Sequence, residues 1–343
     1  MNFQNNRYTL RYADASDNEG IKEIFESGSF QGDFNIHFLR NPFPFESFAE
    51  DGDEARILVI IDNDNQRYVA VGGAVVREEY VNGKAEKCAY LTGLKIHPDY
   101  QKKIFFLPQA YQLMGDGLKD CAYIYTTILD SNDGVVKMLE KKRKNMPEYR
   151  YLGHYITYCF HGGKKKLKLE IDNIKGFDVL MEKYFSKQSF VPCNSEYKGY
   201  GEKTFYSIRK NGEIIACCFV GNQQRSKQYK MCGYGGVYRW LSKIPTQWFG
   251  YPKFPRENNV INHGIISYLY VKDNDNKLCK NFLRTVAKIS GYDLLLWGGF
   301  ENNPLTNVLD SMKTIKYGSR LYSVIWEENV MVQGVIGVEV ALL

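Results

Sequence analysis

The apolar positions of the chain alternate in some stretches and follow a helical period in others. Ala89 to Ile96 predicts a strand, which ends at Pro98 because proline cannot donate to a ladder. The apolar positions that follow are three or four residues apart, so they share one face of a helix. They are Ile104, Leu107, Tyr111, Met114 and Leu118. A strand from Tyr123 to Leu129, a second helix and a strand from Tyr151 to Phe160 complete this part.

The second half of the chain repeats the same order. Ile266 to Val271 predicts a strand, a helical stretch follows, and Leu294 to Trp297 predicts the next strand. A further helix and a closing strand from Leu321 to Trp326 come last. A hairpin precedes the repeated part in each half, and in the second half Asn211-Gly212 marks its turn. The duplication predicts a mixed α/β fold of two similar units, residues 1–162 and 163–343.

One long insertion interrupts the second unit, from Gly221 to His263. Within it, residues 240–255 contain five large aromatic residues among three prolines: Trp240, Trp248, Phe249, Tyr251 and Phe254. Long loops in compact domains are often functional, so the insertion is either a lip over a cleft between the units or a loop packed onto the second unit or across the interface between the units. The sequence leaves both interpretations open.

Composition and charge narrow the ligands that we expect. The length of 343 residues suits two domains, and the net charge of +6 favours an anionic ligand such as coenzyme A. That charge is too small to indicate nucleic acid. No apolar run approaches the roughly 20 residues of a membrane span, so we expect no membrane partner. The eight cysteines are scattered and the amino terminus is polar, which predicts reduced thiols in the cytoplasm. No pair of histidines or cysteines has metal-ligand spacing, so we expect no metal.

This order of elements resembles the GNAT acyltransferase superfamily, in a tandem arrangement. Two stretches carry the resemblance in detail: Leu94 to Phe106, with Asp99-Tyr100-Gln101 after the strand, and Asp130-Ser131-Asn132-Asp133-Gly134 before a helix. The resemblance implies a mostly antiparallel sheet flanked by helices in each unit. It also implies that acetyl- or another acyl-coenzyme A enters between the fourth and fifth strands.

The resemblance further implies which residues hold the coenzyme. They are the backbones of Leu94 and Ile96, the turn Gln101, Lys102, Lys103 and Ile104, and the side chain of Asn132. The family has small residues where Ile104 and Phe106 stand, so Lys102 and Lys103 either compensate by charge or are surface lysines. In the second unit, Asn302 matches Asn132, but residues 272–277 contain no glycine. We therefore expect the coenzyme in the first unit.

Three residues are candidates for the chemistry. Amine acylation needs a base for the amine and an acid for the departing thiolate. Glu79 is the candidate base at the end of the third strand, and Tyr90 is the candidate acid; a solvated strand end and core packing are their structural alternatives. In the N-myristoyltransferases, which are tandem relatives, a terminal carboxylate is the base. Leu343 is the corresponding candidate here, the alternative being an ordinary final strand from Val338.

The sequence thus predicts an N-acyltransferase that transfers an acyl group, acetyl in the first instance, from coenzyme A to an amine. The acceptor is a small molecule or a peptide bound between the units. Two alternatives remain open: a catalytically inactive binding protein on the same scaffold, and a relative that uses aminoacyl-tRNA. The oligomeric state is not predicted.

Overall fold

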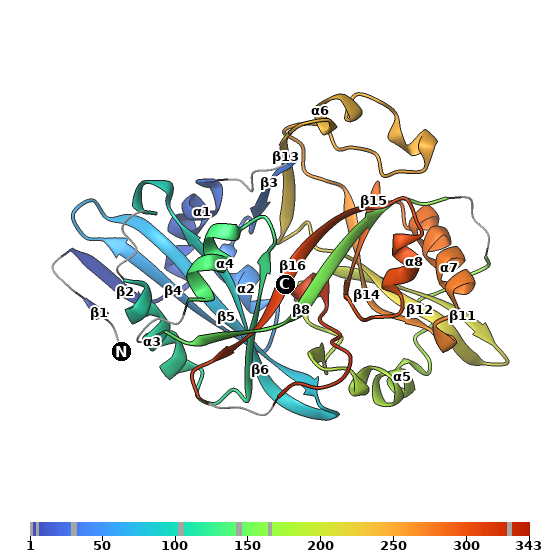
Figure 1. The fold of residues 1–343 in the computed structure, drawn as a ribbon, viewed down its shortest axis with the longest axis horizontal. Coiled ribbons are helices and arrows are strands. Elements are labelled where there is room, and N and C mark those ends of the chain that lie inside the picture. Colours follow the sequence, from blue (N-terminus) through green and yellow to red (C-terminus); the bar gives the residue numbers. More distant parts are fainter. Residues whose placement is uncertain are drawn as a thin grey trace.

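The computed structural model describes residues 3–4, 7–28, 33–101, 106–141, 146–163, 167–327 and 331–343. The first half contains a hairpin-rich sheet and four helices (Figure 1). Its strands are β1 (Phe3–Gln4), β2 (Tyr8–Tyr12), β3 (Phe34–Leu39), β4 (Glu54–Asp62), β5 (Arg67–Val81), β6 (Lys84–Ile96), β7 (Tyr123–Leu129) and β8 (Glu148–Phe160). Its helices are α1 (Asn18–Glu26), α2 (Pro44–Ala49), α3 (Leu107–Gly117) and α4 (Asp133–Leu139).

The second half repeats the sequence of hairpin, strand, helix, strand, helix and strand. Its strands are β9 (Glu170–Ile171), β10 (Val191–Pro192), β11 (Glu202–Lys210), β12 (Glu213–Asn222), β13 (Gln228–Tyr234), β14 (His263–Val271), β15 (Leu294–Phe300) and β16 (Ile315–Ile325). Its helices are α5 (Phe177–Lys183), α6 (Tyr238–Leu241), α7 (Asn276–Ile289) and α8 (Thr306–Asp310). At the predicted β11–β12 turn, Asn211 and Gly212 both have positive φ, as the tight hairpin turn requires.

Within the described residues, both halves join in one 14-stranded sheet. Its order is β1-β2-β4-β5-β6-β7-β16-β8-β15-β14-β12-β11-β9, and β10 pairs with β5. Two of the described neighbouring pairs are parallel, β6 with β7 and β14 with β15. The sheet is otherwise antiparallel, which confirms the predicted mixed, mostly antiparallel architecture.

The two closing strands are exchanged between the halves. β16 comes from the second half of the chain but pairs with β7 of the first, in the register Leu321↔Thr127. β8 comes from the first half but pairs with β15 of the second, in the register Trp297↔Tyr158. β8 and β16 also pair with each other along most of their length. Each half therefore depends on the other for the edge of its sheet.

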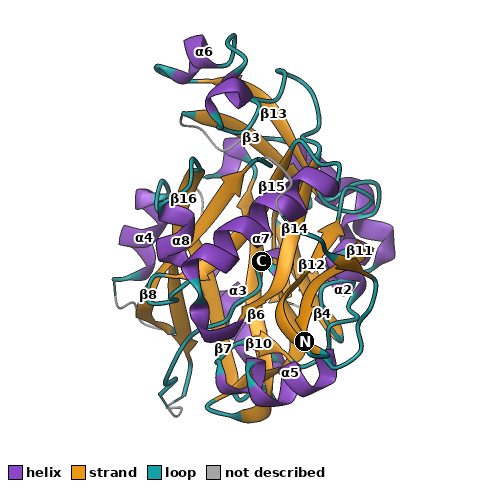
Figure 2. Ribbon diagram, turned by 90° about the vertical axis from the view of Figure 1, so that its right-hand side faces the viewer, coloured by secondary structure: helices purple, strands orange, loops and turns teal. Residues whose placement is uncertain are grey.

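Helices cover both faces of this sheet. α3 and α4 pack on one face through Leu107, Met114 and Val136, and α7 and α8 extend the same layer over the second half. α1 and α2 pack on the other face, where Ile21 and Phe48 are fully buried. Figure 2 shows the sheet edge-on between these layers. Among the described residues, no helix combines the length and the apolarity that crossing a membrane requires.

The structure adds detail in two parts of the chain: it places the insertion across the interface between the halves, one of the predicted alternatives, and it changes the interpretation of the last residues. The insertion contains β13, which pairs with β3 of the first half to form a separate two-stranded sheet. The last residues do not form the final strand that their alternation suggests, because Val340–Leu342 is a 3-10 turn. Val338, Val340 and Leu342 are nevertheless buried, since the turn lies inside the central core between the halves.

Candidate functional site

The strands β6 and β7 run side by side and then part. Their parallel ladder extends from Cys88↔Tyr123 to Leu91↔Thr126. The Thr126 hydroxyl donates to the Leu91 carbonyl at 2.8 Å and closes the ladder at this point. Beyond it, β6 continues to Ile96 and β7 to Leu129 without pairing to each other. Backbone groups of the two strand ends thus face a gap, which can accept an extended ligand as an extra strand.

A β-bulge shapes the β6 side of this gap. The ladder with β5 pairs Gly73 with Thr92 and then Val71 with Lys95, so Gly93 and Leu94 stand opposite a single residue. Gly93 has φ +69°, and a Cβ there would approach the Phe48 ring to 2.7 Å. Glycine is therefore required by both its backbone conformation and its neighbour. The bulge turns backbone groups of β6 away from the β5 ladder at the start of the gap.

The point where the strands part carries a pair of hydroxyl groups. Tyr90 lies on β6, and Thr127 is the first residue of β7 beyond the ladder with β6; their hydroxyl oxygens are 2.7 Å apart. The Tyr90 side chain is buried, and this burial raises the pKa of its phenol above the usual value of 10. A phenol that stays protonated is suited to donate a proton. The predicted packing of Tyr90 in the core and its position at the gap are both observed.

The second half has the same gap, but the chain itself occupies it. The β14–β15 ladder stops at Ile265↔Leu296, and a bulge follows at Tyr268, the counterpart of Gly93, with φ +51°. The Tyr268 amide donates to Oε1 of Glu339 at 2.9 Å. The turn that follows Glu339 contacts both β14 and β15. Residues 338–342 thus lie where a ligand of the second gap would lie.

Glu79 lies on β5, beyond the end of the β6–β7 ladder that is remote from the gap. Its Oε1 accepts hydrogen bonds from Arg77 Nε at 2.6 Å and from the Tyr125 hydroxyl at 2.8 Å. Glu79 is fully buried, whereas Glu78 faces solvent, as expected for adjacent strand residues. Burial raises the pKa of Glu79, and Arg77 and Tyr125 oppose this effect. The solvated strand end that was the alternative interpretation of Glu79 is therefore wrong.

A buried polar network links this cluster to the C-terminal residues. Arg77 Nη1 donates to the Leu342 carbonyl at 3.2 Å, and Lys227 Nζ donates to the Ala341 carbonyl at 2.8 Å. Lys227 also pairs with Asp51 at 2.5 Å, and both side chains are buried. Residues from the first half, the insertion and the chain end are thus tied together beside the central strands. Leu343 follows directly and is half-buried.

The remaining predicted coenzyme residues that the structure describes lie at the end of β6 or shortly after β6 and β7. The Leu94 side chain is exposed and Ile96 is half-buried, both on the unpaired end of β6. Gln101 is exposed, and Asn132 is exposed at the N-terminus of α4. Lys102, Lys103 and Ile104 lie outside the described residues. The bulky Phe106 side chain turns into the core against Tyr8, at 6.2 Å between ring centroids.

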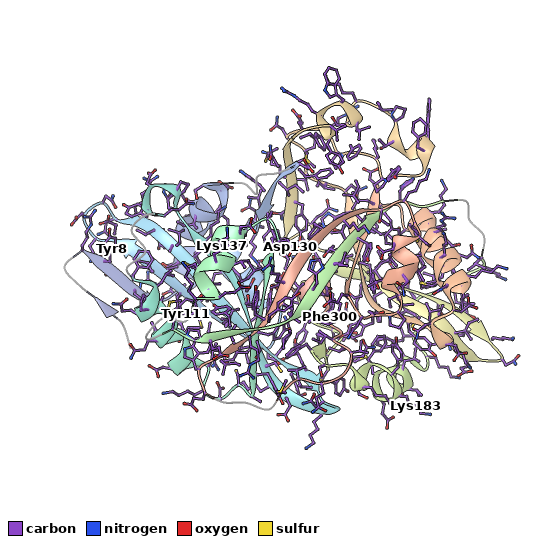
Figure 3. The ribbon with its side chains drawn as sticks, viewed as in Figure 1. Tyr8, Tyr111, Asp130, Lys137, Lys183 and Phe300 are labelled. Atoms are coloured by element: carbon purple, nitrogen blue, oxygen red, sulfur yellow. The ribbon has the colours of Figure 1, made fainter. Side chains whose placement is uncertain are left out.

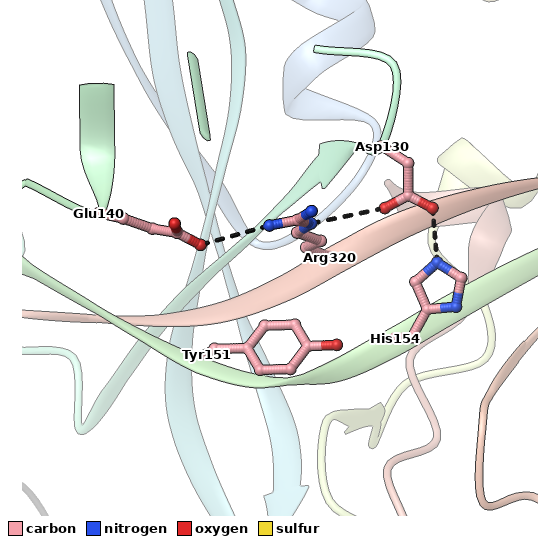
Figure 4. A pocket seen from close by; sticks show the side chains of 5 residues that line it. All are labelled: Asp130, Glu140, Tyr151, His154 and Arg320. Carbon is pink, nitrogen blue, oxygen red and sulfur yellow. Dashed lines mark hydrogen bonds and ion pairs between the residues drawn. The ribbon is translucent and has the colours of Figure 1, made fainter. Parts of the chain in front are cut away.

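A separate pocket of about 490 Å³ opens on the face of the sheet that carries α4 (Figure 4). Its lining residues are Asp130, Glu140, Tyr151, His154 and Arg320. His154 Nε2 lies 2.6 Å from Asp130 Oδ2, and Arg320 lies between Asp130 at 3.8 Å and Glu140 at 3.5 Å. Figure 3 shows Asp130 near Lys137 of α4. His154 is on β8, two strands from β7, which puts it roughly 10 Å of sheet away from the gap.

Several of these residues carry no signal in the sequence. Thr127 is one threonine in an apolar strand, and Lys227 and Asp51 meet only through the tertiary fold. Arg77 is different, because residues two apart in a strand share a face and its pairing with Glu79 follows from that spacing. A buried carboxylate on a strand calls for such a partner.

The chain is similar to several solved structures. No family model matches the chain. No curated protein matches it at a significant level. Among solved structures, N-myristoyltransferase from Saccharomyces cerevisiae with bound myristoyl-CoA is similar at a TM-score of 0.61 and 11% identity, over 95% of this chain and 81% of that one. A GCN5-related N-acetyltransferase from Sphaerobacter thermophilus is similar at 0.55 and 11%, over 96% and 99%. Another, from Anabaena variabilis, is similar at 0.51 and 13%, over 93% and 73%.

These likenesses show the fold. All three structures have the GNAT fold, and each aligns with nearly the whole of this chain. The predicted fold class, a mixed and mostly antiparallel sheet flanked by helices, is therefore confirmed. At this level of identity the likeness extends to architecture and leaves substrate and site residues open.

Proposed function

We propose that the protein is an acyl-coenzyme A-dependent N-acyltransferase whose coenzyme arm lies between β6 and β7. The observation that carries the proposal is the divergence of these strands beyond Leu91 and Thr126. Backbone groups of Leu94 and Ile96 pair with the arm, and Asn132 binds it from the start of α4. The N-terminus of α3 and the turn from Gln101 to Ile104 meet the pyrophosphate, since helix N-termini favour anions.

The second half supports the position of the acyl group. There the bulge amide of Tyr268 donates to a carboxyl oxygen of Glu339. The corresponding bulge in the first half is at Gly93, so its backbone amides are the donors for the thioester oxygen. Such donors stabilise the negative charge that develops on this oxygen when an amine attacks.

Two further roles complete the reaction. The amine nitrogen forms a bond to the thioester carbon, and the carbon–sulfur bond breaks. Tyr90, beside Thr127 at the start of the gap, protonates the departing thiolate. The carboxylate of Leu343 takes the proton of the amine, as predicted from the family resemblance, because Glu79 is held by Arg77 and Tyr125. The acceptor, a small molecule or a peptide, binds between the halves.

Calorimetric titration of the full chain with acetyl-CoA and with myristoyl-CoA tests the proposal. At least one of them is expected to bind, and Asn132→Ala to weaken binding about tenfold, because it removes one or two hydrogen bonds. Asn302→Ala is the matched control: Asn302 is the exposed counterpart beside the occupied gap, and its loss is expected to leave binding unchanged.

Four outcomes separate the possibilities. Absence of binding to both compounds contradicts the proposal, and so does equal weakening by the two asparagine variants. Binding without acylation of any amine in a panel of small amines and N-terminal glycine peptides supports the alternative of an inactive binding protein. Product formation that Asn132→Ala lowers supports the enzyme.

A further inference from the structure

The aromatic residues of the insertion fall into two groups. The first group packs the insertion onto the first half of the chain. Phe254 is buried and stacks on Phe34 of β3 at 5.9 Å between ring centroids, and the Tyr234 hydroxyl donates to the Pro255 carbonyl at 2.5 Å. Thr246 is also buried and donates to the Pro252 carbonyl at 2.6 Å. The base of the insertion is therefore held in place by aromatic packing and hydrogen bonds.

The second group is exposed to solvent, and we call it the aromatic tip. It consists of four exposed aromatic residues and two exposed aliphatic neighbours: Trp240, Trp248, Phe249 and Tyr251, with Val237 and Ile244. Trp248 is 82% exposed and Trp240 is 72% exposed. Soluble proteins seldom expose several large apolar side chains together unless the patch contacts a partner or a membrane.

Cations surround these aromatic side chains. Residues 235–262 contain four basic residues (Arg239, Lys243, Lys253 and Arg256) and one acidic residue, Glu257. Lys243 Nζ lies 5.4 Å from the centre of the Trp240 ring. Lys313, from the loop after α8, lies 5.6 Å from the Tyr251 ring and donates to the Phe249 carbonyl at 2.7 Å. The tip therefore presents apolar rings and positive charge on one surface.

The shape of the tip limits what it can contact. Figures 1 and 2 show α6 and its neighbouring loops standing out from the sheet, at the end of the molecule opposite α5. A projection of this kind offers a convex surface. A flat lipid surface accepts such a projection directly, because tryptophan inserts at the headgroup level while lysine and arginine stay with the anionic headgroups.

We propose that the aromatic tip docks the protein on an anionic membrane surface. The sequence predicts no membrane partner only because it lacks a spanning segment, and peripheral docking needs none. This inference goes beyond the proposed function and does not depend on it, since the tip lies outside the gap between β6 and β7.

Vesicle sedimentation of the full chain tests this proposal. We expect binding to vesicles of phosphatidylcholine with phosphatidylserine, weaker binding to phosphatidylcholine alone, and weaker binding at high salt. Trp240→Ala with Trp248→Ala is expected to lower the partition coefficient at least tenfold, and so is Lys243→Glu with Lys253→Glu. Brominated lipid should quench tryptophan fluorescence in the wild type and lose most of this effect in the double tryptophan variant.

Matched controls distinguish docking from general stickiness. Ile174→Ala with Val179→Ala removes apolar side chains that are 59% and 43% exposed near α5, and Lys183→Glu with Lys210→Glu reverses charge on the second half. Both controls are expected to bind vesicles as the wild type does. Failure to bind anionic vesicles at low salt overturns the proposal. A concentration-dependent dimer that the double tryptophan variant abolishes also overturns it, since a second copy would then cover the tip.

Discussion

At the scale of single residues, Glu339 shows how the second gap is occupied. Its carboxyl oxygen accepts a hydrogen bond from the bulge amide of Tyr268, and the turn that follows it, Val340–Leu342, is buried in the central core. Burial raises the pKa of Glu339 to about 8, against the partly compensating hydrogen bonds from Tyr268 and Ser267. At neutral pH the folded protein therefore holds this carboxyl protonated, and its carbonyl oxygen accepts the amide.

The raised pKa of Glu339 predicts a pH-dependent stability. Between about pH 4.5 and 8 the folded state keeps a proton that the unfolded state releases, so the free energy of unfolding falls as the pH rises. Glu339→Gln keeps the acceptor oxygen and cannot ionise. Urea denaturation measures the free energy of unfolding at each pH. From pH 5 to pH 8 this free energy is expected to fall by about 2 kcal/mol in the wild type, after allowance for partial solvent screening, and the variant is expected to lack this fall. Equal slopes in the two proteins would contradict this account.

At the scale of elements, the β6 bulge controls the shape of the gap. Gly93 has positive φ and packs on Phe48, and the bulge sits where β6 leaves β7. Gly83, in the turn between β5 and β6, has φ +80° and open space around it. The two glycines share a backbone requirement and differ in their neighbours.

The pair of glycines gives a controlled test of the bulge. Gly83→Ala is expected to cost about 1 kcal/mol in the free energy of unfolding, from backbone strain alone. Gly93→Ala is expected to cost roughly 2–4 kcal/mol, because its Cβ also meets the Phe48 ring, and to weaken acyl-CoA binding. Denaturation and calorimetry measure both effects. If the two variants lost the same stability, the contact with Phe48 would not constrain the bulge.

At the scale of the whole molecule, strand exchange makes the halves interdependent. β16 supplies the neighbour of β7, and β8 supplies the neighbour of β15. The C-terminal residues then fill the second gap and bond to Arg77 of the first half. We propose that 1–162 and 163–343 are the two repeated units, with 221–263 inserted in the second. In this arrangement a unit alone exposes sheet edges and part of the central core.

Fragments test this interdependence. Residues 1–162 and 163–343 produced separately are expected to lack native near-ultraviolet circular dichroism, and to recover it when they are mixed and refolded together. The reason is that unpaired strand edges and exposed core cannot be stabilised within one fragment. The intact chain is expected to unfold in one calorimetric transition. A native spectrum for either fragment alone, or two separate transitions, would contradict the expectation.

Local patterns in the sequence predicted most elements but not all of their partners. The periods of Ala89 to Ile96 and Tyr123 to Leu129 predicted the strands that part, because alternation depends on neighbours along the chain. β3 was missed: it lies between the first helix and a proline-rich stretch, and the strand with which it pairs, β13, is far away in the sequence. The C-terminal residues alternate as a strand would, yet they form a buried turn.

Of the candidate site, the sequence by itself determined the repeat, the GNAT-like order of elements and the stretches around Leu94 and Asn132. The repeat and the order of elements follow from spacing along the chain, which sets the faces of helices and strands, and the two stretches follow from the family resemblance. Only the tertiary structure decided that Tyr90 meets Thr127, that Glu79 is held by Arg77 and Tyr125, and that Glu339 and the turn after it lie in the gap of the second half. The physical reason is that strand exchange and burial depend on contacts between residues far apart in sequence, and local periodicity does not specify them.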